Sequence, residues 1–321
     1  MKPILTLLFT AMLCLQTRAE DLKLGIIGLD TSHCTAFTGL INNKTHKDHV
    51  PGAKVVAAFK GGSPDIPSSI GKVEEYTSVM RGQFGVEICD TIEEVCARVD
   101  AVMIESVDGR PHLAQARIVI AAGKPLYIDK PLGGTLRDAL EIIQLAEKAN
   151  VPLFTSSSLR FAKSTQAVRA GSIGRVLRAE TTSPAHLEPA HPDLYWYGVH
   201  GCESLFTVMG TGCEAVERRT AADGKIEVTG TWHGGRQGVF RESNTYGGRA
   251  HGEKGEAPIG DFDGYAPLVV EIVKFFQTKK SPVDPAETRE LFAFMEAADE
   301  SKRQGGKPVL LQEVLAKAAV K

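Results

Sequence analysis

The feature that most constrains the fold is a regular alternation of short β-rich runs and helical stretches between residues 22 and 157. In order, the runs read LKLGIIG (22–28), KVVAAF (54–59), VEIC (86–89), AVMIES (101–106), PLYIDK (125–130) and PLFTSS (152–157). Amphipathic stretches separate them, such as residues 135–149, where Thr135 followed by Asp138 predicts a capped helix start. This alternation is typical of parallel βαβ units. It predicts an α/β fold with a doubly wound parallel sheet, whose ligands bind at the carboxyl ends of the strands.

The second half of the chain has a different texture. Glycine becomes frequent, and three segments read as antiparallel strands: 175–183, 225–234 and 238–243. Residues 244–264 read as loops, and a helical tail follows them. We therefore predict a doubly wound, Rossmann-type domain at residues 20–157. An α+β domain with a mainly antiparallel sheet should follow at residues 158–321.

Residues 1–19 have the pattern of a secretory signal peptide. Lys2 precedes an uncharged, mostly apolar run over residues 3–15, and small residues surround a cleavage point after Ala19. A Sec-type signal of this kind predicts a secreted or periplasmic protein. Export raises the question of disulfides, and five cysteines remain after cleavage. They are Cys34, Cys89, Cys96, Cys202 and Cys213, and one disulfide is possible in an oxidising compartment. Cys89, Cys96 and Cys202, however, lie in apolar patterns that favour buried free thiols.

Composition and charge exclude several classes of partner. The chain has 321 residues, of which 43% are hydrophobic, and it can bury two ordinary cores. Its formal net charge of -2 gives no general attraction to nucleic acids or anionic membranes. No later apolar run is long enough to span a bilayer. A small molecule is the predicted partner, and a homo-oligomer is left open.

The stretch GIIGLDTSH, residues 25–33, occupies the position of a glycine-rich dinucleotide turn after the first strand. Aligned on G-x-G-x-x-G, Gly28 takes the first position, Asp30 the second and His33 the third. A carboxylate at the second position would repel a pyrophosphate by about 4 kcal/mol at about 4 Å. Asp30, Thr31 and Ser32 are also all good N-cap residues for the next helix. The turn therefore predicts the fold but argues against ordinary NAD or NADP binding.

Asp30 and His33 could also act together. Three residues apart, they could form a proton-transfer pair or supply two ligands to a metal ion. No third ligand is evident in the local sequence, and the remaining histidines are too scattered to choose among. We therefore predict no metal site.

Other polar residues follow the later strands. Asp129 and Lys130 end the fifth strand, where a lysine can donate to a substrate hydroxyl or stabilise an alkoxide. After the second strand, Lys60 and Ser63 would suit the 2′-phosphate of NADP. After the fourth strand, polar side chains gather at a third strand end: Ser106, Asp108, Arg110 and His112.

The second domain contributes a further set. His200 begins the helical stretch HGCESLFTVMG, and its spacing places Glu203 on the same face. Histidine is the side chain best suited to proton transfer near neutral pH. Tyr195 and Tyr197, on either side of Trp196, could stack on a sugar ring or pack in the core.

In order and spacing, these motifs resemble the glucose-fructose oxidoreductase and inositol dehydrogenase family, usually written Gfo/Idh/MocA. The glycine turn, Asp129-Lys130-Pro131, the stretch Tyr197-Gly-Val-His200 and the closing GGKPVLLQEV (305–314) carry the resemblance. It implies a domain that holds NAD or NADP, joined to an open sheet that binds a sugar or cyclitol. Members typically have Glu-Lys-Pro, whose lysine is catalytic, and Asp-x-x-x-His. Here Asp129 replaces the glutamate, and Trp196 stands four residues before His200.

Carried to this chain, the resemblance implies an oxidoreductase in which Lys130 and His200 handle the proton. It also places Ser106, Asp108 and His112 in the loop on the nicotinamide side. Two alternatives remain open at this point. One is a lyase or hydrolase that acts on keto-sugars in the same crevice without hydride transfer, and the other is a carbohydrate-binding protein without catalysis.

Overall fold

The computed structural model describes residues 20–319, and the predicted signal peptide therefore lies outside the described residues. The first sheet has six parallel strands in the order β3-β2-β1-β4-β5-β6. This order reverses direction between β1 and β4, as a doubly wound sheet does. The strands are β1 (Leu22–Ile27), β2 (Ala53–Phe59), β3 (Glu87–Cys89), β4 (Ala101–Ile104), β5 (Leu126–Ile128) and β6 (Leu153–Thr155). The predicted parallel α/β domain is confirmed.

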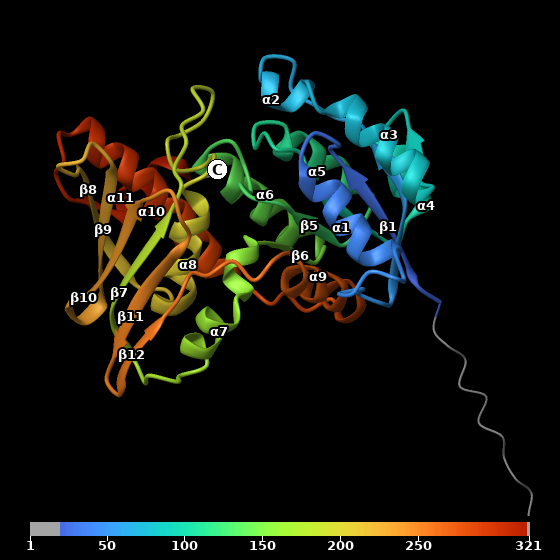
Figure 1. Ribbon diagram of the computed structural model, residues 1–321. Helices are drawn as coiled ribbons and strands as arrows, with labels where there is room; N and C mark the ends of the chain where they lie inside the picture. Colours follow the sequence, from blue (N-terminus) through green and yellow to red (C-terminus); the bar gives the residue numbers. More distant parts are fainter. Residues whose placement is uncertain (1–19, 320–321) are drawn as a thin grey trace, which may run out of the picture.

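Helices connect these strands and cover both faces of the sheet (Figure 1). Threonine side chains cap three of them: Thr31 accepts from the His33 amide, Thr91 from that of Glu94 and Thr135 from that of Asp138. Of the three cap candidates in the glycine turn, Thr31 is therefore the one used. The helices are α1 (Ser32–Asn42), α2 (Pro67–Ile70), α3 (Val73–Phe84), α4 (Ile92–Arg98), α5 (His112–Ala121) and α6 (Leu136–Ala149).

The second sheet has seven strands in the order β12-β11-β7-β10-β9-β8-β13. This sheet is mixed, because β7 and β10 run parallel to each other, while all other neighbouring strands in it pair antiparallel. The prediction of loops over residues 244–264 is wrong in part, since this region contains the hairpin of β11 and β12. The strands are β7 (Val176–Ser183), β8 (Cys213–Thr220), β9 (Ile226–Trp232), β10 (Arg236–Glu242), β11 (Gly247–Gly252), β12 (Gly255–Pro258) and β13 (Val309–Leu310).

The helices of the second half pack on this sheet, with one exception. Helix α9 (Ala266–Thr278) lies against the first domain, beside α1 (Figure 1), and its apolar face joins the core around β1 and β2. The predicted boundary at residue 157 therefore separates the two sheets, but the hydrophobic core of the first domain also contains residues of α9 from beyond that boundary. The other helical elements are η1 (Ser158–Phe161), α7 (Lys163–Arg169), α8 (Val199–Met209), η2 (His233–Gly235), α10 (Pro285–Arg303) and α11 (Leu311–Ala318).

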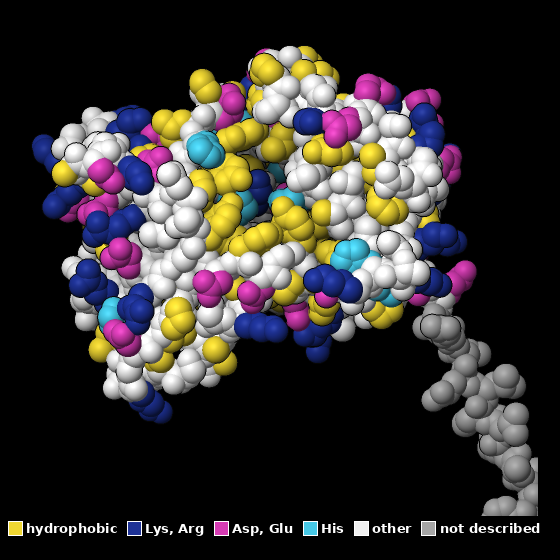
Figure 2. All heavy atoms as spheres, viewed as in Figure 1, with side chains coloured by type: hydrophobic (Ala, Val, Ile, Leu, Met, Phe, Trp, Pro, Cys, Tyr) yellow, Lys and Arg dark blue, Asp and Glu magenta, His cyan; other side chains and the backbone are white. Residues whose placement is uncertain are grey.

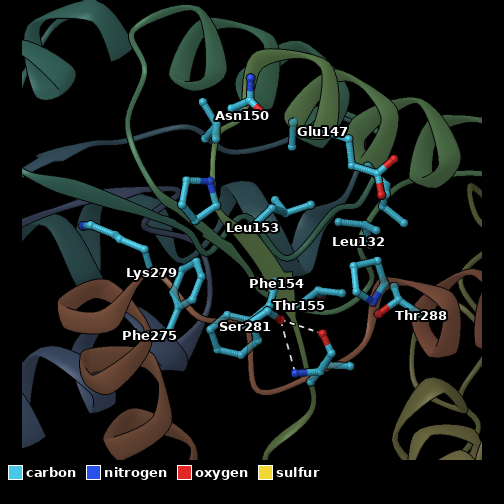
Figure 3. Close-up of a pocket in the computed structure, with 16 residues that line it drawn as sticks. Leu132, Glu147, Asn150, Leu153, Phe154, Thr155, Phe275, Lys279, Ser281 and Thr288 are labelled. Atoms are coloured by element: carbon cyan, nitrogen blue, oxygen red, sulfur yellow. Dashed lines mark hydrogen bonds between the residues drawn. The ribbon is translucent and has the colours of Figure 1, made fainter.

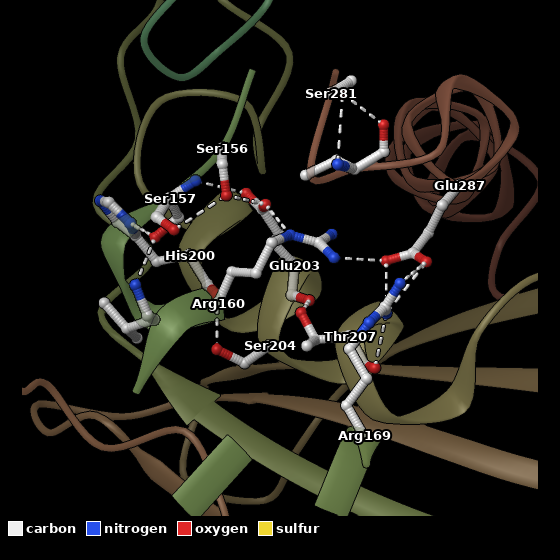
Figure 4. Close-up of polar contacts among 12 residues, drawn as sticks. Ser156, Ser157, Arg160, Arg169, His200, Glu203, Ser204, Thr207, Ser281 and Glu287 are labelled. Carbon is white, nitrogen blue, oxygen red and sulfur yellow. Dashed lines mark hydrogen bonds and ion pairs between the residues drawn. The ribbon is translucent and has the colours of Figure 1, made fainter. Parts of the chain in front are cut away.

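A buried ion network fixes the junction after β6 (Figure 4). Arg160, in η1, donates to Glu203 of α8 and to Glu287 of α10, each at 2.6 Å. Arg169 reaches the same Glu287 carboxylate from the outside at 3.1 Å. Because buried charges are tolerated only when they are paired and hydrogen-bonded, this arrangement fixes how α8 and α10 meet.

Two sequence predictions about the whole chain can be checked here. All five cysteines that the structure describes are free and buried, so the prediction of buried thiols is confirmed. Within residues 20–319, no helix combines the length and the apolar character that a membrane crossing requires.

Candidate active site

The glycine turn closes β1 where the sequence placed it. Gly28 has φ +96°, and a Cβ at this position would lie 2.4 Å from the Ser106 amide nitrogen. Only glycine allows this conformation and this approach. The turn is therefore packed tightly against the end of β4.

Asp30 at the second glycine position faces inward. Its carboxylate accepts from Ser69 Oγ at 2.6 Å and from the Val107 amide at 3.1 Å. Burial raises the pKa of this carboxyl group. Asp30 thus ties α2 to the loop after β4, and the alternative in which Asp30 pairs with His33 is wrong, because their partners differ.

A bridge of polar side chains crosses over the end of β1. Ser63 Oγ, after β2, donates to Asp108, after β4, at 2.6 Å. Arg110 binds both Asp108 and Asp65. Lys60 pairs with Glu74 at 2.7 Å on the surface. His191 from the second domain completes the bridge, with Nε2 3.0 Å from Asp108 Oδ1.

This bridge decides how well a dinucleotide fits. Strand β1 lies between β2 and β4 in the sheet, so a link from Ser63 and Asp65 to Asp108 and Arg110 spans the place where a pyrophosphate would cross the glycine turn. The Arg110 guanidinium is already paired with Asp65 and Asp108, and these two carboxylates would repel phosphates. A pyrophosphate could cross the turn only if this bridge between Ser63, Asp108 and Arg110 opened.

The partner of His33 is Asp129, ninety-six residues away in the sequence. His33 Nδ1 lies 2.6 Å from Asp129 Oδ2, and the Tyr127 hydroxyl lies 3.3 Å from Asp129 Oδ1. Burial alone would raise the pKa of Asp129, but the charge and hydrogen bond of His33, together with Lys130, hold it at about 2. The structure therefore makes an acid–imidazole pair from residues of α1 and the end of β5.

Glu105 is a residue that the sequence reasoning missed. It follows β4 directly, is fully buried, and neither carboxylate oxygen has a hydrogen-bond partner among the described residues. Burial first, and then the charge of Asp129, raise the pKa of Glu105 well above its usual value. The available signal was its position, because Glu105 directly follows the apolar residues AVMI (101–104) and precedes Ser106.

Lys130 and His200 lie in the same region as this pair. Lys130 is buried, and its Nζ lies 5.9 Å from the centre of the Tyr197 ring. His200 Nδ1 lies 2.7 Å from Ser157 Oγ (Figure 4). Burial, and then the charge of Lys130, lower the pKa of His200 well below 6.5. A neutral imidazole thus stands near a lysine, which is a suitable arrangement for moving a proton.

Aromatic rings form one wall above these groups. Successive ring contacts of 4.8 to 6.2 Å run from Tyr197 through His200, Tyr246, Phe262 and Tyr265 to His33. Figure 2 shows a hollow between the two halves of the molecule, where hydrophobic side chains, histidines and a basic side chain gather. Tyr246 and Phe262 were missed because residues 244–264 read as loops, and Tyr265 directly follows that region.

Three other predicted site residues have structural roles. Tyr195 is fully buried against Phe292, so its ring cannot stack on a sugar. Glu203 is buried and binds Arg160, Ser156 and the Ser157 amide, so it cannot bind substrate directly (Figure 4). Both ring nitrogens of His112 lie 2.8 Å from backbone carbonyl oxygens. Tyr195 is thus withdrawn from the hollow by burial, and the polar atoms of Glu203 and His112 are occupied by contacts within the protein.

A separate cavity of about 410 Å³ opens beside β6, between α6 and the segment that joins α9 to α10 (Figure 3). Leu132, Phe154 and Phe275 give it an apolar lining, and Glu147 and Lys279 lie at its edge. None of the acid–base groups described above lines it. The hollow between the domains is therefore the candidate active site.

Comparisons with known proteins agree with this architecture. Residues 23–157 match the family described as "Oxidoreductase family, NAD-binding Rossmann fold". The chain is 30% identical over 142 residues to 1,5-anhydro-D-fructose reductase of Ensifer adhaerens, and this alignment covers 42% of each protein. The chain thus spans less than half the length of that reductase.

Solved structures extend the similarity to nearly the whole chain. The apo scyllo-inositol dehydrogenase of Lactobacillus casei has a TM-score of 0.72 at 16% identity, over 91% of this chain and 99% of that one. The myo-inositol dehydrogenase of the same organism, in complex with NAD(H) and myo-inositol, has a TM-score of 0.71 at 17% identity, over 91% and 97%. At these identities the likeness concerns the fold. The family match therefore concerns the Rossmann domain: residues 23–157 match the Gfo/Idh/MocA oxidoreductase family.

Proposed function

We propose that this protein is an oxidoreductase that acts on a hydroxyl group of a sugar, cyclitol or glycoside. The observation that carries the proposal is the meeting of Lys130, His200 and the His33–Asp129 pair in an aromatic-walled hollow between the domains. Similarity to a sugar reductase and to inositol dehydrogenases supports a carbohydrate-type substrate.

The proposed proton chemistry uses groups from both domains. Lys130 lies at the end of β5, where ligands of such sheets bind, and its ammonium group would donate to or stabilise the substrate oxygen. His200 is neutral and oriented by Ser157, so it can accept a proton. Tyr197 and Tyr246 would offer ring faces to the apolar side of a sugar.

The hydride acceptor of the proposed reaction would be NAD or NADP, as the Rossmann family suggests. The bridge through Asp108 and Arg110 would have to open for a pyrophosphate, and this observation supports a second candidate. This is acid–base elimination or hydrolysis of a keto-sugar by the same residues without a nucleotide. For a protein exported through a signal at residues 1–19, as we also propose, a nucleotide-free reaction would be advantageous.

Turnover assays on the mature protein test the first candidate. A panel of sugars, cyclitols and glycosides is incubated with NAD⁺ or NADP⁺, and reduced nicotinamide is followed by absorbance. We expect Lys130→Met to lower kcat by about 10²- to 10⁴-fold, since it removes a proton-transfer group. Lys274→Met, on the exposed side of α9, is the matched control and should keep full activity. Absence of turnover by the wild type with either nucleotide across the panel would contradict the proposal.

A nucleotide titration separates the two candidates. Saturable quenching of NADH or NADPH fluorescence by the wild type would favour the oxidoreductase. If quenching appears only in Asp30→Gly, the acid excludes the cofactor. Products formed from keto-sugars without nucleotide, and lost in Lys130→Met, would then identify the second candidate.

A further inference from the structure

Three metal-ligating side chains converge at the carboxyl edge of the first sheet. His33 comes from the first turn of α1, Glu105 follows β4 and Asp129 follows β5. One ligand atom of each lies within 4.8 Å of the other two. Residues far apart in the sequence are thus brought to a single point between adjacent strand ends.

Glu105 has no hydrogen-bond partner, although it lies beside two other possible metal ligands. Its side chain is fully buried, and both carboxylate oxygens are without a hydrogen bond among residues 20–319. A buried carboxylate in this state is costly unless it is paired or coordinates a metal. Since one of its oxygens lies within reach of both His33 and Asp129, a cation at their common centre would satisfy it.

The two remaining ligands are already oriented for such an ion. His33 Nδ1 and Asp129 Oδ2 face each other at 2.6 Å, and a cation could replace the proton they share if the two atoms moved slightly apart. The Tyr127 hydroxyl occupies the other oxygen, Asp129 Oδ1. Phe37 stacks on the His33 ring at 5.2 Å, which fixes its plane. Supporting contacts of this kind are usual around metal ligands.

We propose that His33, Glu105 and Asp129 bind a divalent first-row transition metal, such as Zn²⁺ or Mn²⁺. One imidazole nitrogen and two carboxylates form a donor set that suits these ions better than Mg²⁺ or Ca²⁺, which prefer oxygen alone. Three protein ligands leave coordination positions open, so the ion could also bind substrate oxygens in the hollow. His33 and Asp129 also belong to the proposed active site, but metal binding is measured without turnover, so the failure of either proposal can be told from that of the other.

Calorimetric titration of the mature, chelator-treated protein with Zn²⁺, Mn²⁺ and Mg²⁺ tests the site. We expect a single equivalent of Zn²⁺ or Mn²⁺ to bind, with release of protons, more tightly than Mg²⁺. Glu105→Gln and Asp129→Asn, which preserve side-chain shape, should each weaken binding by about tenfold or more. Bound metal should also raise Tm in the wild type but not in these variants.

Glu214→Gln is the matched control, since Glu214 also contacts a histidine, His233, but on the surface. It should bind metal as the wild type does. Circular dichroism establishes that each variant is folded before its titration is interpreted. The proposal fails if the wild type binds no stoichiometric transition metal, or if Glu105→Gln binds it as tightly as the wild type.

Discussion

At the scale of single residues, the site is built from ionisable groups whose charge states are set by burial. The pKa of Glu105 is raised and that of His200 is lowered, because burial disfavours the charged form of each. Asp129 keeps a low pKa only because His33 and Lys130 are close. Groups with displaced pKa values that share one hollow are a typical property of active sites.

The lowered pKa of His200 predicts a pH dependence of stability. Below pH 6.5 the unfolded chain protonates this histidine, while the folded protein does not until the pH is much lower. The free energy of unfolding should therefore fall as the pH drops through this window, with a contribution of at most about 1.4 kcal/mol per pH unit. His200→Asn, which keeps a polar atom near Ser157, should remove this contribution.

Urea unfolding between pH 7 and pH 5 measures the effect, with the slope of stability against pH as the readout. His186→Asn, at an exposed histidine, should keep the wild-type slope. An unchanged slope in His200→Asn would mean that the buried imidazole protonates as readily as in the unfolded chain.

At the scale of elements, the helices of the second domain are positioned by charges as well as by apolar packing. Helix α8 is buried along its whole length, so it has no solvent-facing side on which Glu203 could meet a substrate. Arg160 connects this helix to α10 through Glu203 and Glu287. The same helix carries His200, and the network therefore also positions the candidate active site.

Arg160→Met should destabilise the protein by about 3–5 kcal/mol, because it leaves the buried Glu203 without its cation and Glu287 with Arg169 alone. Arg169→Met is the matched control, since Arg169 binds the same Glu287 carboxylate but its side chain is 34% exposed. Its loss should be about 1 kcal/mol or less. The two variants are compared by their denaturant midpoints, provided that the m-value stays constant. Equal losses of unfolding free energy would contradict the idea that the burial of Arg160 makes its ion pairs more important than those of Arg169.

At the scale of the whole molecule, the two domains are interlocked. Helix α9 belongs to the second half of the sequence but packs in the core of the first domain, where Phe275 meets Phe154 at a ring distance of 4.8 Å. His191 reaches from the second domain to Asp108 in the first. These contacts predict that the domains unfold together.

Phe275→Ala tests this cooperativity, with an expected loss of about 3–5 kcal/mol for a buried aromatic ring. Both tryptophans, Trp196 and Trp232, lie in the second domain, so their fluorescence reports chiefly that domain. If unfolding is cooperative, the fluorescence and far-UV circular dichroism transitions shift equally. Val270→Ala, on the exposed face of α9, should shift neither by more than about 0.5 kcal/mol. A shift in circular dichroism alone would show that the domains unfold separately.

Much of the first domain could be predicted from local sequence. The apolar runs predicted all six strands of its sheet, and Thr135 predicted its cap, because strand and cap signals depend on neighbouring residues. The hairpin at residues 247–258 was missed because its sequence, rich in glycine and charged residues, lacks an apolar alternation. Tyr195 and Glu203 were misassigned because burial depends on distant partners such as Phe292 and Arg160.

The sequence by itself determined the fold class, the position of the glycine turn at Gly28 and the presence of Lys130 at a strand end. Each follows from periodicity or from residue types at fixed local spacing. Only the tertiary structure decided which polar groups meet. His33 pairs with Asp129 rather than with Asp30, and Glu105 completes their cluster, because a parallel sheet brings the ends of distant strands together at one edge.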